Sequence, residues 1–351
     1  MTPEALQQIG RAFGKDCMFV PLGKGHINDT YRSSDGKWIL QRINTGIFTK
    51  PYEVMENIEA VTAWIRGKLR ADGGDERRGT LTVIHTADGA PLYTDQSGCW
   101  RMYENIAGTH SVEPEERTLT DFCKAAAAFG RFQRELQDFP AEKLHETIPD
   151  FHNTPKRFEK LKAAVQACQD RERLEMARPG IEYAFSQERL APVITSGITD
   201  GSIPLSVTHN DTKINNVLFD DDTGETIAVV DLDTVMPGAR LYDFGDAVRS
   251  GAVTAAEDEP DISKVHFDPE AYLVFREGYL SEMKDTLTDN EMQLLFKSAE
   301  LLTYECGIRF LTDYLENDVY FKTDYPEHNL VRARNQFRIL QEMLDWEKEH
   351  R

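Results

Sequence analysis

A short polar segment in the middle of the chain carries residue types that can do chemistry. The stretch THNDTKINNVLFD occupies residues 208–220, and VVDLDT follows at residues 229–234. His209, Asp211 and Asn216 fit the spacing H-x-D-x-x-x-x-N, which is that of a kinase catalytic loop followed by a metal-binding aspartate. The complete string, with Asp231 across a hairpin, is more specific than H-x-D alone. It predicts phosphoryl transfer.

Each residue type suits one part of that chemistry. An attacking hydroxyl needs a carboxylate to orient it and to take its proton, which is a role for Asp211. Mg²⁺ prefers hard oxygen ligands, and the amide of Asn216 and the carboxylate of Asp231 can supply them. Lys213 can balance charge on the transferring phosphoryl group. The alternative interpretation is a polar turn whose Asn and Asp side chains cap local backbone groups.

The hydrophobic pattern indicates which elements position these residues. LSVTH has the pattern of a strand and leads into the loop NDTKINN, while VLFD and TIAVVDLD predict a hairpin around DDTGE. The polar residues then lie near the ends of neighbouring strands, where they can converge on one site.

The rest of the chain divides into a β-rich first third and a helical remainder. A candidate hairpin over residues 18–43 turns at Ser34-Asp35-Gly36, and an amphipathic helix follows at residues 51–69. Helical patterns prevail from about residue 107, interrupted by a β-patterned insert around residues 205–235. The apolar face of the first helix comprises Val54, Ile58, Val61 and Ile65. This plan predicts an α+β fold with two lobes.

Capping signals place several helix starts. Capping boxes begin at Thr118 and at Thr288. Thr154 is expected as an N-cap, with proline at the first helical position. The tail over residues 327–349 predicts a last amphipathic helix.

Charge and hydropathy narrow the classes of partner. The 351 residues carry a formal net charge of −20, which argues against nucleic acid or an anionic membrane as a general partner. A nucleotide is not excluded, because bound Mg²⁺ and local cations can reverse the field. We find no apolar run long enough to cross a bilayer and no signal-peptide core. Five scattered cysteines without a CxxC pair are typical of free thiols, so we expect a cytoplasmic protein.

The quoted motifs resemble those of a known group of enzymes. THNDTKINNVLFD, AVVDLDTVMPG and LYDFGDAVR are similar to motifs of the aminoglycoside phosphotransferase and choline kinase superfamily, and within it to the N-acetylhexosamine 1-kinases. GKGHINDTY, WILQRINTGIF and ECGIRFLTDYLENDVYF extend the resemblance over nearly the whole chain. It implies a bilobal, protein-kinase-like fold. Residues 1–105 would form an N-terminal nucleotide-binding lobe, and residues 106–351 a mainly helical lobe for catalysis and acceptor binding.

The resemblance also implies roles for particular residues. Asp211 falls on the catalytic base, and Asn216 and Asp231 fall on the ligands of Mg²⁺. Asp243 falls on a carboxylate that supports the loop. Asp233 is a second candidate for the metal, although the family frame favours Asp231.

Candidate nucleotide contacts come from three segments. GKGH can cover the phosphates with backbone N–H groups, although a structural hairpin turn explains it equally well. WILQRI departs from the kinase pattern, because Gln41 stands where a kinase strand carries a lysine and Arg42 follows it. Strand alternation lets only one of these two point into the cleft. Backbone groups of CWRMYEN can read adenine, with Met102 packing nearby. The candidates are Gly23, Gly25, Gln41, Arg42, Met102, Tyr103, Glu104 and Asn105.

Candidate acceptor contacts lie at the two ends of the chain. Arg309 interrupts the apolar run GIRFL, and a buried arginine is costly unless it is paired. The resemblance puts Arg309 and Tyr320 on positions that contact the sugar. A salt-bridged helix arginine is the alternative for Arg309, and a core or rim position for Tyr320. His26 and Asn28 can face the sugar or the phosphate.

Three functional hypotheses follow. The first is an ATP- and Mg²⁺-dependent kinase that phosphorylates the anomeric hydroxyl of N-acetylglucosamine or N-acetylgalactosamine. The second keeps the fold and the chemistry but uses an amino alcohol, an aminoglycoside or another sugar. The third is a nucleotide-binding scaffold without turnover, which only the missing strand lysine supports. A monomer or a small homo-oligomer suits each hypothesis.

Overall fold

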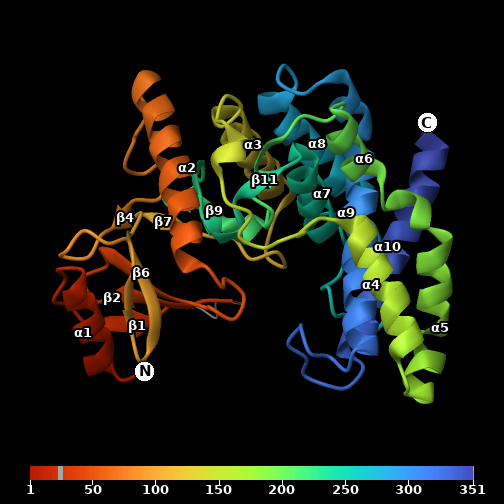
Figure 1. The fold of residues 1–351 in the computed structure, drawn as a ribbon. Coiled ribbons are helices and arrows are strands. Elements are labelled where there is room, and N and C mark those ends of the chain that lie inside the picture. The colour runs from red at the N-terminus through yellow and green to blue at the C-terminus, as the bar shows by residue number, and fades with distance from the viewer. Residues whose placement is uncertain (23–26, 351) are drawn as a thin grey trace.

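The computed structural model describes residues 1–22 and 27–350, and it confirms the expected α+β class. A sheet-rich N-terminal part lies on the left of Figure 1, and a mainly helical C-terminal part lies on the right. The β-patterned insert lies between them in the same view, on the side of the helical part that faces the N-terminal sheet.

The N-terminal part is built on a six-stranded antiparallel sheet in the order β1-β2-β3-β6-β4, with β5 paired to β6. The predicted turn at Ser34-Asp35-Gly36 joins β2 to β3, and Gly36 has a φ of 72°, a conformation that glycine adopts without strain. The strands are β1 (Phe19–Pro21), β2 (Asp29–Ser33), β3 (Trp38–Ile43), β4 (Val83–Ile84), β5 (Tyr93–Asp95) and β6 (Gly98–Glu104).

The two faces of this sheet have different neighbours. Leu40 and Met102 pack in a buried cluster with helix α1 (Pro3–Ala12). Strand alternation turns Gln41 and Arg101 to the opposite face. Tyr103 on that face belongs to the main core, together with helix α2 (Pro51–Ala71). The predicted apolar stripe of α2 is confirmed, since Val54, Ile58, Val61 and Ile65 are all buried.

The insert forms two small sheets that hold the central motif. β9 (Val217–Asp220) and β10 (Thr226–Val229) make the predicted hairpin, and β7 (Thr109–His110) pairs with β9. β8 (Ser206–Thr208) pairs with β11 (Met236–Gly238). The motif therefore follows the end of β8, and Asp231 follows the end of β10.

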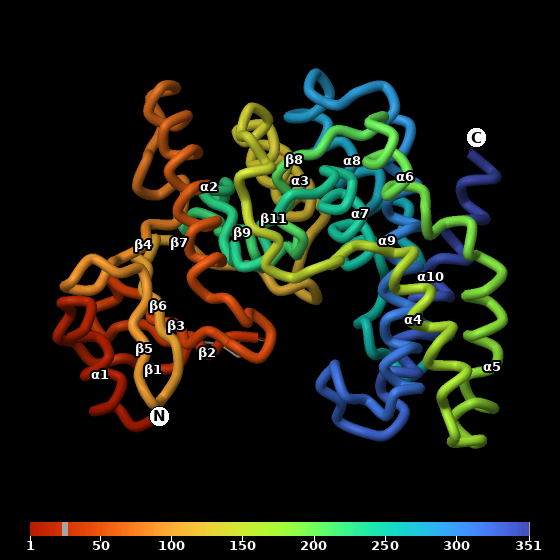
Figure 2. Tube along the Cα trace, viewed as in Figure 1, coloured from red at the N-terminus to blue at the C-terminus, as the bar shows by residue number. Residues whose placement is uncertain are grey.

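Helices make up the rest of the C-terminal part. They are α3 (Leu119–Glu135), α4 (Thr154–Ala167), α5 (Arg171–Ser186), α6 (Val193–Asp200), α7 (Arg240–Gly251), α8 (Pro269–Met283), α9 (Asp289–Leu315) and α10 (His328–His350). Short 3-10 turns lie at Ala141–Lys143, Glu188–Leu190, Ile214–Asn216, Leu232–Thr234 and Ile262–Lys264. The chain between α9 and α10 extends towards the N-terminal part, as Figure 2 shows.

Two of the three predicted caps are confirmed. Thr118 and Thr288 each form a full capping box. The prediction for Thr154 is wrong by one residue, because the side chain of Asn153 caps α4 by accepting from the backbone N–H of Lys156. Thr154 is the first helical residue, and its hydroxyl donates to the buried Glu305 at 2.6 Å.

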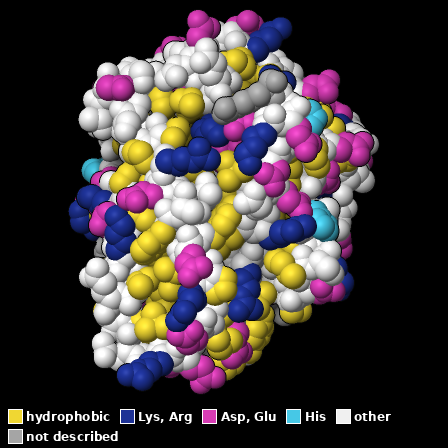
Figure 3. All heavy atoms as spheres, turned by 90° about the vertical axis from the view of Figure 1, so that its right-hand side faces the viewer, with side chains coloured by type: hydrophobic (Ala, Val, Ile, Leu, Met, Phe, Trp, Pro, Cys, Tyr) yellow, Lys and Arg dark blue, Asp and Glu magenta, His cyan; other side chains and the backbone are white. Residues whose placement is uncertain are grey.

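The surface is polar and of mixed charge where it is shown. On the face seen in Figure 3, basic and acidic side chains lie among smaller apolar patches. None of the helices in the described ranges combines the length and the apolar character needed to cross a bilayer.

Candidate active site

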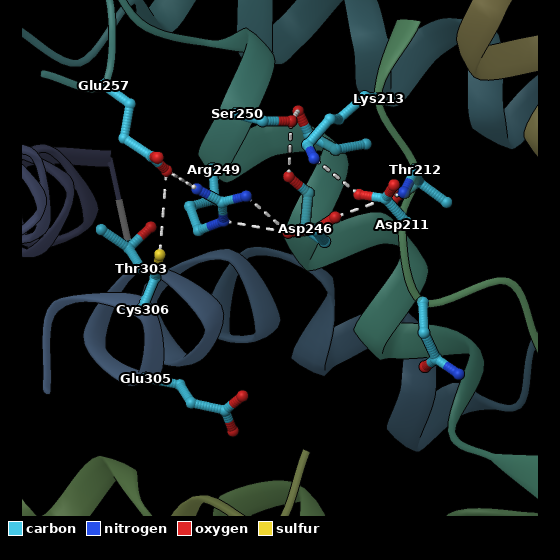
Figure 4. A network of polar contacts seen from close by, with 12 residues as sticks. Asp211, Thr212, Lys213, Asp246, Arg249, Ser250, Glu257, Thr303, Glu305 and Cys306 are labelled. Carbon is cyan, nitrogen blue, oxygen red and sulfur yellow. Dashed lines mark hydrogen bonds and ion pairs between the residues drawn. The ribbon is translucent and has the colours of Figure 1, made fainter. Parts of the chain in front are cut away.

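The central loop brings three predicted residues into contact. Nζ of Lys213 lies 2.9 Å from Oδ1 of Asp211. Figure 4 marks this contact with a dashed line. Nδ2 of Asn216 donates to the backbone oxygen of Asp211 at 2.8 Å and to its Oδ2 at 3.2 Å. Both carboxylate oxygens of Asp211 are thus oriented by a neighbour, and its side chain remains half-exposed. A reactant can therefore reach this carboxylate.

A buried aspartate holds the loop from behind. Asp243 on α7 accepts hydrogen bonds from the backbone N–H groups of His209 and Asn210, at 2.9 and 2.8 Å, and from the side chain of Gln133 at 2.6 Å. Burial raises the pKa of Asp243, although these hydrogen bonds and His209 oppose the rise. These are the contacts expected of a residue that supports the loop.

His209 also has a structural place. Its Nε2 lies 2.9 Å from the backbone oxygen of Val230, and its ring meets those of Phe129 and Phe132 edge-on. The side chain is fully buried, so the histidine of the motif anchors the loop to the core.

The sequence reasoning missed a second supporting aspartate, Asp246. It accepts from the backbone N–H of Thr212 at 3.2 Å and pairs with Arg249, whose Nε and Nη2 lie 2.9 and 2.8 Å from its Oδ1 (Figure 4). Burial alone would raise its pKa, but Arg249 and Lys213 hold the pKa below its usual range. The sequence signal that could have identified Asp246 is its position one helical turn after Asp243 on α7.

Asp231 lies beside this loop in a negative environment. Its backbone has a φ of 59°, in the left-handed region that costs a non-glycine residue about 1–2 kcal/mol. The side chain reaches solvent but is closely surrounded by protein. This burial, followed by the charges of Asp233 and Asp211, raises the pKa of Asp231 to about 7, although Arg101 and Lys213 oppose the rise. A cation bound here would relieve that repulsion.

The donor set fits a magnesium ion that also binds phosphate. No described residue donates a hydrogen bond to Oδ1 of Asn216, so a hard oxygen is left beside the Asp211 carboxylate. Within the described ranges no three His, Cys, Asp or Glu residues are grouped to hold a metal by themselves. Protein-bound Mg²⁺ commonly uses one or two protein oxygens and completes its shell with phosphate and water. Asn216 and Asp231 meet that requirement.

Asp233, the second metal candidate, is already engaged. Its Oδ1 pairs with Nη1 of Arg101, and its Oδ2 accepts from Nδ2 of Asn28 at 2.6 Å. Oδ1 of Asn28 in turn accepts from the backbone N–H of Asn44 at 2.9 Å. Asn28, a predicted substrate contact, is therefore buried between Asn44, which follows β3, and Asp233, which follows β10.

The choice between Gln41 and Arg42 is decided by strand alternation. Gln41 contacts Arg101 on the face that meets Asp233. Arg42 lies on the other face, where it pairs with Asp29 at 2.6 Å and donates to the backbone oxygen of Ser97 at 3.4 Å. Sequence reasoning overlooked Arg101, although it lies directly opposite Gln41 in the β3–β6 register.

The CWRMYEN segment has its own contacts in the N-terminal sheet. Strand alternation buries Met102 in the cluster under α1, on the face opposite Gln41 and Arg101, and its packing near a nucleotide stays a prediction. The ring of Tyr103 lies against the guanidinium of Arg101, at 5.1 Å. The backbone N–H groups of Glu104 and Asn105 already donate to the backbone oxygens of Thr82 and Lys37, at 2.9 and 2.8 Å. Adenine contacts of this segment stay a prediction, and Gly23, Gly25 and His26 lie outside the described residues.

The predicted acceptor residues occupy the end of α9 and the segment after it. Arg309 is half-buried, and its guanidinium lies 5.5 and 5.6 Å from the rings of Phe151 and Phe321. No acidic group within the described ranges forms an ion pair with it, unlike the salt-bridged arginine considered above. Tyr320 is 55% exposed and is tied by its backbone N–H to Asp313 at 2.8 Å.

A separate cavity of about 160 Å³ opens behind the catalytic loop. Asn210 and Phe151 line it, together with Asp150, His152 and Tyr242. Its described lining includes Asn210, the residue before Asp211, but not Asp211, Asn216 or Asp231. Phe151 connects it to the surroundings of Arg309.

A family comparison decides what kind of protein carries this loop. Residues 19–275, more than half of the chain, match the model described as the phosphotransferase enzyme family. The chain belongs to this phosphotransferase family. The matched region includes the N-terminal sheet, the catalytic loop and Asp231, and it ends before Arg309. The predicted relationship is thereby confirmed at the level of the phosphotransferase family.

Solved structures share the fold of the phosphotransferase family over nearly the whole chain. A microcompartment-associated aminopropanol kinase is 18% identical, with a TM-score of 0.61 over 98% of this chain and 98% of that one. The GDP complex of aminoglycoside 2'-phosphotransferase-IIIa is 13% identical, with a TM-score of 0.62 over 96% and 99%. A choline/ethanolamine kinase family protein from Mesorhizobium loti is 17% identical, with a TM-score of 0.56 over 93% and 88%.

Proposed function

We propose that the protein transfers the γ-phosphoryl group of ATP to the anomeric hydroxyl of N-acetylglucosamine or N-acetylgalactosamine, giving hexosamine 1-phosphate and ADP. The observation that carries the transfer is the half-exposed carboxylate of Asp211, oriented by Lys213 and Asn216. The observation that bears on the acceptor is the guanidinium of Arg309, held between two aromatic rings without an acidic partner in the described ranges.

In this proposal Asp211 orients the attacking hydroxyl and takes its proton as the bond to phosphorus forms. The oxygen–phosphorus bond to ADP breaks on the opposite side. Lys213 lies close enough to Asp211 to face the transferring group as well, and its charge opposes the negative charge there. The burial of Asp243 and its three donors keep the loop rigid, so the base needs little reorganisation.

Asn216 and Asp231 are the residues that would hold Mg²⁺. When bound, the metal would neutralise phosphate charge and align the phosphates for in-line transfer. The raised pKa of Asp231 supports this role, because it reports crowded carboxylates that a divalent cation would relieve.

Two arginines lie near each other on the proposed acceptor side. Burial and the neighbouring charge of Arg309 lower the pKa of Arg157, whereas Glu305 and Asp150 oppose that lowering. An arginine can donate to the hydroxyl and carbonyl oxygens of an N-acetylated sugar, which suits the proposed acceptor. The nearby carboxylates balance part of the positive charge, so charge in this region does not separate a sugar from a cationic acceptor.

A second candidate keeps the chemistry and changes the acceptor to an amino alcohol or an aminoglycoside. The net charge of −20 favours it, and so does the fold shared with an aminopropanol kinase. The two hypotheses differ in which acceptor receives the phosphoryl group, so a panel of acceptors separates them.

The test uses purified protein with ATP and Mg²⁺, and N-acetylglucosamine, N-acetylgalactosamine, choline or kanamycin in separate reactions. Phosphorus NMR identifies each product. We expect a sugar 1-phosphate signal that is lost in Asp211→Asn and kept in Asp222→Asn, which changes an exposed turn residue of the β9–β10 hairpin. If choline or kanamycin is phosphorylated and neither sugar is, the proposed acceptor is wrong. If no acceptor is phosphorylated, the proposed phosphoryl transfer is wrong.

A further inference from the structure

The strand that faces the catalytic loop lacks the usual phosphate-binding lysine. Gln41 occupies that position in β3, and its amide is neutral. Its Oε1 accepts from Nε of Arg101 at 2.9 Å, and its Nε2 donates to the hydroxyl of Thr30 at 3.0 Å. Gln41 thus positions Arg101 through this hydrogen bond, and its own side chain carries no charge.

A positively charged side chain lies on the neighbouring strand. Arg101 in β6 is directly opposite Gln41 in β3, and directly opposed residues of antiparallel strands project from the same face. Its side chain is only 1% exposed and pairs with Asp233, two residues after the proposed metal ligand Asp231. The sheet therefore delivers a guanidinium to the place where the kinase pattern expects an ammonium group.

Part of this guanidinium is unused. Nε is taken by Gln41 and Nη1 by Asp233, whereas no described residue accepts a hydrogen bond from Nη2. Arginine has five N–H donors in a rigid fork that matches phosphate oxygens in pairs. Nη2 of Arg101 is not among the fully buried polar atoms that lack a partner in the described ranges, so a ligand oxygen can meet this donor.

We propose that Arg101 binds the phosphate groups of the nucleotide, in place of the lysine that β3 lacks. This inference rests on the proposed kinase function. Among the described residues, Arg101 and Lys213 are cations whose charges act on Asp231, and Asp211 and Asp233 are anions that do the same. A magnesium nucleotide supplies a cation for the carboxylates and phosphates for the guanidinium, so every charge keeps a partner when it binds. Asp233 holds Arg101 in position beforehand.

The rival explanation is that Arg101 only ties the N-terminal sheet to Asp233. The two explanations differ in whether the binding affinity lost on removing the Arg101 side chain depends on the phosphate groups of the ligand. Isothermal titration with ADP and Mg²⁺, and separately with adenosine, measures that dependence without turnover. In Arg101→Met we expect ADP affinity to fall about tenfold to a hundredfold, because charge-assisted hydrogen bonds are lost. We expect adenosine affinity to change less than about threefold, since it has no phosphate.

Two further variants keep the test informative if Arg101→Met does not fold. Arg101→Lys keeps the charge but loses the fork, and an intermediate loss of ADP affinity is expected. Gln41→Lys combined with Arg101→Gln moves the cation to the opposed position, and it should bind ADP more tightly than Arg101→Gln alone. Arg66→Met is the matched control, because Arg66 is a half-buried arginine of α2 that bonds Leu81 and Thr82. Thermal melts establish which variants are folded.

Each outcome has a definite meaning. Equal loss of ADP and adenosine affinity, or unchanged ADP affinity in a folded Arg101 variant, overturns the inference. If such a result accompanies sugar phosphorylation by the unaltered protein, the proposed function stands alone. If ADP affinity depends on Arg101 but no acceptor is phosphorylated, the inference stands and the proposed function falls. An unaltered protein that does not bind ADP overturns both.

Discussion

Asn28 and Asp233 are 205 residues apart in the chain, yet Nδ2 of Asn28 lies 2.6 Å from Oδ2 of Asp233. Both side chains are buried. Asp233 therefore ties β2 of the N-terminal sheet to the segment that follows β10, and it shares this contact with Arg101. It contributes to the relative position of the sheet and the catalytic loop, together with contacts such as that of Asn57 Nδ2 with the backbone oxygen of Val235 at 2.9 Å.

Removing the amide of Asn28 should weaken the fold. Asn28→Ala leaves Asp233 one donor short and also removes the acceptor for the backbone N–H of Asn44. A buried group without its partner costs about 1–3 kcal/mol, so the free energy of unfolding should fall by that amount in urea titrations. Asn290→Ala, which removes an exposed contact to Ser202, should change it by less than about 0.5 kcal/mol. Equal changes in the free energy of unfolding for the two variants would show that the Asn28–Asp233 hydrogen bond does not stabilise the fold.

The metal dependence should be sensitive to Asn216. Asn216→Ala removes the proposed amide ligand and one donor to Asp211, so the Mg²⁺ concentration for half-maximal turnover should rise at least about tenfold. A titration of activity against Mg²⁺ measures this. Asn215→Ala changes the adjacent asparagine, whose side chain bonds Glu113 at 3.4 Å, and should leave the Mg²⁺ requirement unaltered. Matching Mg²⁺ curves for both variants would remove Asn216 from the metal site.

Replacing Arg309 should lower the reaction efficiency with the sugar acceptor without changing nucleotide affinity. Arg309→Met keeps much of the side-chain length between Phe151 and Phe321 but loses the donors. We expect kcat/KM for the sugar to fall about tenfold to a hundredfold, with ADP affinity unchanged. Arg332→Met is the matched control, because Arg332 also lies over a ring, that of Phe310 at 5.5 Å. A loss shared by both variants would point to packing of the aromatic cluster.

Glu300 should make stability depend on pH. Its side chain has no exposed surface, and burial raises its pKa to about 7 although Lys297 opposes the rise. The ordinary value is 4.5, so the folded state holds the proton more tightly than the unfolded state. The contribution of this group is most favourable below pH 4.5 and is lost as the pH rises through about 7, by about 3 kcal/mol in total.

Glu300→Gln removes this titration. The variant should therefore gain stability relative to the unaltered protein as the pH rises from 5 to 8, while Lys297 keeps its ion pair with Glu347 at 2.9 Å. Urea titrations at several pH values measure the difference, with the exposed Glu349→Gln as control. Parallel stability curves for Glu300→Gln and the unaltered protein would show that Glu300 does not titrate in this range.

Much of the catalytic loop was predictable because its contacts are local. Asp211, Lys213 and Asn216 lie within six residues, so a tight turn after a strand brings them together whatever surrounds it. The hairpin that leads to Asp231 is also a local structure, set by alternation and by turn residues. The same holds for the capping boxes at Thr118 and Thr288, whose partners are three residues away.

By itself, the sequence determined the β-rich first third, the helical remainder with its β-patterned insert, and the composition of the catalytic loop, because these rest on interactions between near neighbours. Only the tertiary structure decided that Arg101 faces Gln41 and reaches Asp233, that Met102 is buried under α1, and that Arg309 has aromatic neighbours and no acidic partner in the described ranges. The physical reason is that strand register and helix packing are set by the whole core. A shift of one residue in β6 would turn Arg101 away from the loop and Met102 towards it.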